Sequence, residues 1–325
     1  MEYALPRSLN DLAESFNIVE TRGYATYDPS KTYTIYLEYC PRGSLADLVK
    51  RYQKIRTLRD ENGTPISGRI PVRVMWSIFE ALASTVCLMY QGHFPGDGET
   101  SRNDFSAFVH RDIKPENIFL ANPDSNFWPQ VPVAKMGDFG LAVLADDVEK
   151  QGTNGWKAPE MIEYDAPFED SEDEFLEDLP DYNQLYPPHV LCDVWSLGRV
   201  MLALMNLEDP VDVPELRFDE DDVAPGPFND PPDKTSGKHD QSYYAGVKEY
   251  YPDEMRRLVE RCLQMNPEDR VDPDTLWNEV HSHVAACKGL RGRPLREMQR
   301  DCLGRELLLM EHVETRDLVK GQWAT

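Results

Sequence analysis

The sequence predicts an α+β fold in which a short β-rich segment precedes a mainly helical body. Residues 33–37 (YTIYL) are β-branched and aromatic, which is typical of a strand, and a turn at residues 27–30 precedes them. Apolar residues recur at helical spacing through much of the remaining sequence. The 325 residues are enough for one large domain, or two modest ones, with a buried core.

Helical periodicity predicts five helices, at residues 44–54, 71–90, 190–207, 252–265 and 273–288. Ser44 stands where it can cap the first helix, and Pro71 suits the start of the second. The second helix is long and apolar, so we expect it to be buried. Short strands and loops are expected between the second and third helices.

The negative charge is concentrated in two tracts. The chain carries 34 Lys and Arg against 58 Asp and Glu, a net charge of −24. Residues 165–181 hold nine acids and no base, and residues 208–233 hold ten acids and one Arg, so the tracts carry −18 of the total. We expect them to be insertions near 165–185 and 208–240. A solvated segment without a ligand is the favoured interpretation, and a basic protein partner is the alternative.

Composition also bounds the partners and the compartment. The acidic balance argues against nucleic acid and against an anionic membrane surface. No run approaches 18 uninterrupted apolar residues, and the first residues lack the pattern of a secretory signal, so we expect no membrane span. The six cysteines are scattered, which predicts reduced thiols and a cytoplasmic or nuclear location.

Five short segments follow one another in a diagnostic order: 110–117 (HRDIKPEN), 138–140 (DFG), 158–160 (APE), 193–198 (DVWSLG) and 266–270 (NPEDR). Together they resemble the catalytic loop, metal-binding turn, activation segment and following helices of the eukaryotic protein kinases. One such triplet is a weak signal, whereas five in one order are specific. The resemblance runs from about Phe16 to about Val284 and implies a protein-kinase-like fold with a mainly α C-terminal lobe.

The resemblance implies transfer of the γ-phosphate of ATP, with Mg²⁺, to Ser or Thr hydroxyls of protein substrates. Asp112 would accept the proton of the substrate hydroxyl, and Lys114 would approach the γ-phosphate. Asn117 and Asp138 would ligate Mg²⁺, which prefers oxygen ligands. Lys114 and Thr153 at these positions resemble Ser/Thr kinases rather than Tyr kinases.

By the same resemblance, residues 38–40 form the hinge between two lobes. The carbonyl of Glu38 and the N–H of Cys40 would bond the edge of adenine. Leu37 would guard the pocket behind the adenine, and Phe119 would lie under its ring.

Further residues take supporting roles in this resemblance. Asp193 would brace the backbone of the catalytic loop, and Arg270 would form an ion pair with Glu160. His110 and Phe139 would stack in the core.

The activation segment has no hydroxyl-bearing residue between Asp138 and Thr153, although Arg111 supplies the cation that receives a loop phosphate in relatives. Two interpretations stay open. One of the nearby carboxylates pairs with Arg111 and orders the segment, or all of them are solvated. These carboxylates are Asp146, Asp147 and Glu149.

Near the substrate groove, Glu116 and the tract 165–181 favour basic residues around the target hydroxyl.

Residues 1–37 contain neither a G-x-G-x-x-G motif nor a strand lysine of the V-A-I-K type. We therefore expect a remnant of the small lobe at 1–37, the large lobe at 41–288, and a tail at 289–325. Two alternatives follow. The chain belongs to a Ser/Thr kinase whose small lobe is encoded upstream, or it is a catalytically impaired kinase or pseudokinase that serves as a protein-binding module.

Overall fold

The structure is a computed structural model, which describes residues 15–58, 63, 68–93, 105–124, 131–162, 189–208, 250–264 and 266–289. The acidic tract 165–181, the tail beyond residue 289 and the first 14 residues lie outside the described residues. Of the second acidic tract, only Glu208 is described. The expectations for these segments therefore stay predictions.

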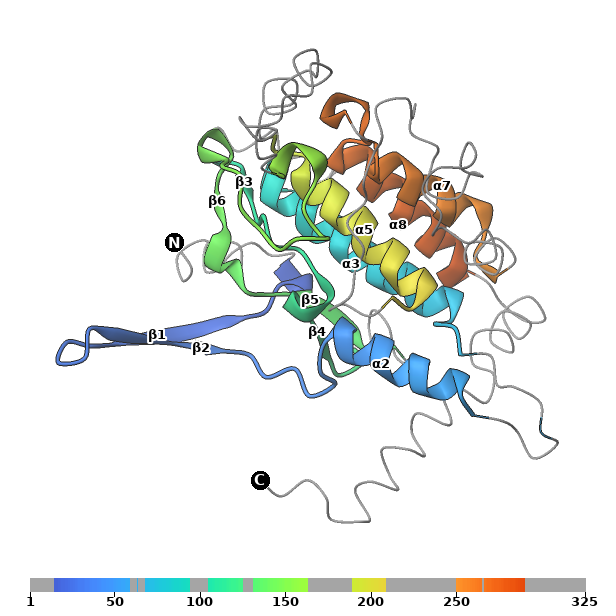
Figure 1. Cartoon of the computed structure of the whole chain (residues 1–325), viewed down its shortest axis with the longest axis horizontal. Helices are drawn as coiled ribbons and strands as arrows, with labels where there is room; N and C mark the ends of the chain where they lie inside the picture. The colour runs from blue at the N-terminus through green and yellow to red at the C-terminus, as the bar shows by residue number, and fades with distance from the viewer. Residues whose placement is uncertain are drawn as a thin grey trace, which may run out of the picture.

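Strands β1 (Thr21–Tyr27) and β2 (Thr32–Leu37) form an antiparallel hairpin that extends away from the helical body (Figure 1). Its turn is closed by a hydrogen bond of 3.3 Å from the N–H of Lys31 to the carbonyl of Asp28. The predicted strand and the turn before it are thus confirmed. The tyrosines of the hairpin are largely exposed, so these strands contribute little to the core.

The body contains the five predicted helices: α2 (Leu45–Arg56), α3 (Val72–Gln91), α5 (Cys192–Asn206), α7 (Asp253–Cys262) and α8 (Pro273–Gly289). Ser44 caps α2 as predicted. Its hydroxyl accepts from the N–H of Asp47 at 3.3 Å, and the Asp47 carboxylate accepts from the N–H of Ser44 at 2.9 Å. This reciprocal capping box fixes where the helix begins.

Helix α3 lies inside the body and packs against α5 and α8 (Figure 1). By length and hydropathy alone it is long and apolar enough to cross a membrane, although the sequence contains no run of 18 uninterrupted apolar residues. In this structure 83% of its apolar window is buried within the protein, so it is placed as a core helix. Helix α5 is more enclosed still, since all of its residues are buried.

Two further pairs of short strands lie between α3 and α5. Strand β3 (Phe108–Val109) pairs with β6 (Val143–Leu144), and β4 (Ile118–Ala121) pairs with β5 (Val133–Met136). The antiparallel register places Ile118 opposite Met136. The two pairs therefore bring the ends of the catalytic loop and of the metal-binding turn to one place.

Within the described loops there are five 3₁₀ turns: η2 (Pro115–Asn117), η3 (Phe139–Leu141), η4 (Ala145–Asp147), η5 (Pro159–Met161) and η6 (Pro267–Asp269). A sixth, η1 (Ser15–Asn17), joins the first described residues to the body. The Asn17 amide donates to the carbonyl of Ala134 at 3.0 Å, and the N–H of Val19 donates to the carbonyl of Met136 at 2.9 Å. Ile18 between them is buried, so this segment packs with the helical body rather than with the hairpin.

Candidate active site

The catalytic loop is held from below by Asp193, at the start of α5. Its two carboxylate oxygens accept from the N–H groups of His110 at 2.6 Å and Arg111 at 2.9 Å. Burial raises the pKa of Asp193 above its ordinary value, although these hydrogen bonds and the nearby positive charge oppose the shift. Arg111 has a left-handed backbone, with φ of 67°, which a non-glycine residue keeps only where its surroundings hold it. The predicted bracing by Asp193 is confirmed.

His110 is fully buried and packs on Phe139, with the ring centroids 4.8 Å apart. Its Nδ1 accepts from the N–H of Asp112 at 3.3 Å, and its Nε2 lies 3.0 Å from the carbonyl of Gly137. Since Nδ1 accepts from an N–H, Nε2 is the ring nitrogen that donates its proton to the carbonyl of Gly137. His110 thus spaces the catalytic loop from the metal-binding turn, as predicted.

The carboxylate of Asp112 is the centre of a tight polar cluster. One oxygen, Oδ2, accepts from Nζ of Lys114 at 2.8 Å and from Nδ2 of Asn117 at 3.0 Å. The other, Oδ1, accepts from the hydroxyl of Thr153 at 2.6 Å, and Lys114 also donates to that hydroxyl at 2.8 Å. The fold therefore brings together Asp112, Lys114 and Asn117, and it adds Thr153 from a position 41 residues later.

Asn117 and Asp138 present oxygens at the ends of β4 and β5. The N–H of Gly137 donates to the carbonyl of Asn117 at 2.9 Å, which brings the two chain segments together. Nδ2 of Asn117 is used by Asp112, so its Oδ1 points elsewhere. Asp138 is exposed, has a left-handed backbone with φ of 60°, and its carboxylate has no partner among the described residues.

Such a pair of oxygens fits Mg²⁺, which commonly takes one or two protein ligands and completes its shell with phosphates and water. The described part of the chain contains no group of three or more His, Cys, Asp or Glu side chains that would form an all-protein metal cage.

The hinge segment is tied to β5 by an ion pair that the sequence did not reveal. Lys135, on β5, lies 2.9 Å from the Glu38 carboxylate, which also accepts from the N–H of Glu20 at 3.0 Å. The N–H of Glu38 donates to the carbonyl of Glu20 at 2.8 Å. The Glu38 carbonyl and the Cys40 N–H have no partner among the described residues. The hinge prediction assigns these two groups to adenine, and no described residue competes for them.

The remaining predicted cleft residues lie around this segment. Phe119 is half-buried, opposite Lys135 in the β4–β5 ladder, while Leu37 is 47% exposed at the end of β2. In the described structure Leu37 therefore does not close a pocket. Partial burial, with help from the Glu38 charge, raises the pKa of the Cys40 thiol, so Cys40 is a protonated thiol at neutral pH.

Arg111 does not pair with a carboxylate in the described part of the chain. The interpretation that a nearby carboxylate of the activation segment pairs with Arg111 is therefore wrong. Its Nε donates to the carbonyl of Leu141 at 2.7 Å, and Nη1 donates to the carbonyl of Glu149 at 3.3 Å. The side chains of Asp146, Asp147 and Glu149 are exposed. Main-chain carbonyls, not side-chain anions, satisfy this buried guanidinium.

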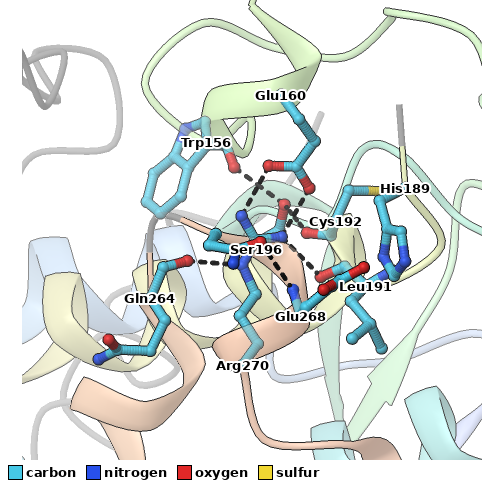
Figure 2. A network of polar contacts seen from close by, with 10 residues as sticks. Trp156, Glu160, His189, Leu191, Cys192, Ser196, Gln264, Glu268 and Arg270 are labelled. Carbon is cyan, nitrogen blue, oxygen red and sulfur yellow. Dashed lines mark hydrogen bonds and ion pairs between the residues drawn. The ribbon is translucent and has the colours of Figure 1, made fainter. Parts of the chain in front are cut away.

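The end of the activation segment is fixed by the predicted pair of Glu160 and Arg270 (Figure 2). Both side chains are fully buried, and the guanidinium donates to both carboxylate oxygens at 2.6 Å. Arg270 also donates to the carbonyls of Gln264 at 2.8 Å and Leu191 at 3.2 Å. The two parallel hydrogen bonds make this a strong and geometrically specific Arg–carboxylate contact.

The sequence matches the model of the protein kinase domain family over residues 6–284. It is similar to the G2-specific protein kinase nimA of Emericella nidulans, with 22% identity over 77% of this chain and 30% of that protein. It is also similar to the G2-specific protein kinase nim-1 of Neurospora crassa, with 25% identity over 75% of this chain and 24% of that protein. The chain thus spans less than a third of the length of these relatives. With the family match over most of its length, the chain belongs to the protein kinase domain family.

Proposed function

We propose that this protein transfers the γ-phosphate of ATP to Ser and Thr hydroxyls of protein substrates. Asp112 is the acceptor for the substrate hydroxyl proton. Lys114 offsets charge that develops on the transferred phosphoryl group, and Asn117 orients Asp112 while offering its own oxygen to a metal.

One observation carries this proposal: Asp112 already accepts a hydrogen bond from an alcohol, the hydroxyl of Thr153, at 2.6 Å. A carboxylate offers about four lone-pair sites. Lys114 and Asn117 occupy those of Oδ2, and Thr153 occupies one on Oδ1. Among the described residues no group takes the remaining acceptor site on Oδ1, which is therefore available to the hydroxyl of a substrate.

Asn117 and Asp138 would hold Mg²⁺, which in this family neutralises phosphate charge during transfer. The free carbonyl of Glu38 and the free N–H of Cys40 would bond adenine, with Phe119 beneath the ring and Leu37 beside it. Lys114, whose Nζ lies beside Asp112 and Thr153, would face the phosphates from the catalytic loop.

The domain division proposed for this chain is a small-lobe part at 1–37, a hinge at 38–40, a large lobe at 41–288 and a tail at 289–325. A cytoplasmic or nuclear location is part of the proposal, supported by free thiols at the described cysteines 40, 87, 192 and 262. The acidic composition favours protein substrates with basic residues beside the target hydroxyl. It argues against nucleic acid and against a membrane surface as a partner.

The proposal is tested by transfer of labelled γ-phosphate from Mg·ATP to Ser, Thr and Tyr versions of one basic peptide. We expect Ser and Thr peptides to be labelled, and Asp112→Asn to lower the rate by about 10²–10⁴-fold. Asp147→Asn, which removes an exposed carboxylate of the activation segment, serves as the matched control and should leave the rate unchanged. Mg·ATP binding without any transfer would instead support the binding-module alternative.

A further inference from the structure

Arg199 is a buried arginine on α5 whose contacts lie away from the nucleotide cleft. Its side chain is 1% exposed, and its Nε donates to the carbonyl of Gly155 at 3.3 Å. The guanidinium carbon lies 5.7 Å from the ring centroid of Trp156, within the range of a cation–π contact. The neighbouring helix residue Ser196 donates to the carbonyl of Trp156 at 2.9 Å. Two residues of α5 therefore hold the same part of the activation segment.

The residues that α5 holds form one tight turn. The N–H of Trp156 donates to the carbonyl of Thr153 at 3.1 Å, and Gly155, the third residue, has φ of 83°. A positive φ at the third position is what a type II turn requires, and glycine adopts it without strain. Thr153, the first residue of the turn, donates to Asp112 at 2.6 Å. The position of this turn thus sets where the Thr153 hydroxyl meets the reactive carboxylate.

A single carboxylate neutralises Arg199. Oε2 of Glu208 lies 2.7 Å from Nη2 of Arg199, and the Glu208 side chain is 7% exposed. Asn206 donates to the other Glu208 oxygen at 3.3 Å. Nη1 of Arg199 has no hydrogen-bond partner within the described ranges, and Glu208 is the one carboxylate there that forms an ion pair with Arg199. Loss of Glu208 would leave a buried, unpaired guanidinium, which is a strongly unfavourable arrangement.

Glu208 is also the first acid of the tract at 208–233, which the sequence analysis interpreted as solvated. Its burial against Arg199 corrects that interpretation at this one position. The tract begins at a residue that belongs to the core beneath the activation-segment turn.

We propose that the Arg199–Glu208 pair is a positioning pair for the turn at 153–156, and through Thr153 for the acceptor site at Asp112. This inference rests on the proposed kinase function for its catalytic consequence, but not for its structural one. Neither residue touches the reacting atoms. The pair acts by holding the turn, so its loss should impair use of the peptide more than use of ATP.

The test compares Glu208→Gln, Arg199→Met and Arg199→Lys with a control, Glu279→Gln, which breaks the half-exposed pair of Glu279 with Arg261. Hydrogen exchange is measured over residues 152–157 and over α3 in the full chain. We expect faster exchange at 152–157 in Glu208→Gln and Arg199→Met with α3 unchanged, partial recovery in Arg199→Lys, and no change in the control. Exchange at 152–157 equal to the wild type in both first variants would overturn the proposal.

Kinetics give the second readout. We expect kcat/KM for a Ser peptide to fall about tenfold or more in Glu208→Gln, because small misplacement of a catalytic group is costly, while KM for ATP stays unchanged. Equal loss for peptide and ATP would indicate a general structural effect and contradict the proposal. If the wild type transfers no phosphate but exchange changes as expected, the pair is established and the proposed kinase function fails. If transfer occurs but exchange does not change, the kinase function stands and the positioning role of the pair fails.

Discussion

Replacing Arg270 with Met tests how strongly the end of the activation segment depends on its ion pair. The change leaves the fully buried Glu160 carboxylate without the two 2.6 Å hydrogen bonds that now compensate its charge. It also frees the carbonyls of Gln264 and Leu191 and removes a guanidinium 5.2 Å from the Trp195 ring centroid. Breaking a buried pair from one side costs about 3–5 kcal/mol.

At about 2–4 °C per kcal/mol for a domain of 150–250 residues, this cost corresponds to a fall in Tm of about 6–20 °C. Circular dichroism during heating measures it. The double variant Glu160→Met with Arg270→Met should recover much of the loss, because no charge then remains buried. Arg261→Met, which breaks a half-exposed pair, should cost less than about 1 kcal/mol. A Tm for Arg270→Met within 2 °C or so of this control would refute the reasoning.

Three further predictions concern the cap, the cleft and the pH response. Ser44→Ala removes the hydroxyl that accepts from the N–H of Asp47 and should lower the free energy of unfolding by about 0.5–2 kcal/mol in urea titration. Gly137→Ala would place a Cβ 2.9 Å from Cε2 of Phe119, so overpacking should lower the free energy of unfolding by about 1–3 kcal/mol. Displacement of Phe119 should also raise the Kd for ATP in a binding titration. An unchanged Kd would count against Phe119 as the residue that lies under the adenine ring. Burial lowers the pKa of His189 below its ordinary 6.5, so the unfolded chain binds this proton at a higher pH than the folded chain does. The free energy of unfolding should therefore fall as the pH drops below 6.5. Urea titrations at pH 7.5 and 5.5 measure this fall, which His189→Gln should reduce.

Much of the fold was predictable because its signals are local. Apolar periodicity marks α3 and α5, and the capping box at Ser44 marks where α2 begins. The order of the five motifs also predicted which residues gather at Asp112, and the structure brings Lys114 and Asn117 to it.

The errors and omissions concern contacts that only the tertiary fold creates. Arg111 binds the carbonyls of Leu141 and Glu149, and a list of side chains says nothing about where main-chain carbonyls point. Lys135 and Glu38 are 97 residues apart and carry no motif that would pair them.

Glu208 was grouped with an acidic tract because charge runs are normally solvated. Its place beside Arg199 follows from the left-handed backbone of Leu207, with φ of 56°, which ends α5 and turns the chain back toward the helix. No propensity signals that turn, because Leu rarely adopts this conformation.

The central claim is that Asp112 keeps one acceptor site on Oδ1 for a substrate hydroxyl, beside a metal held by Asn117 and Asp138. A crystal structure of the full chain with Mg²⁺, a non-hydrolysable ATP analogue and a Ser peptide measures this directly. The account predicts the Ser Oγ within about 2.6–3.2 Å of Asp112 Oδ1, with the oxygens of Asn117 and Asp138 on the metal. A peptide hydroxyl bound away from Asp112, or a metal that neither residue contacts, would contradict it.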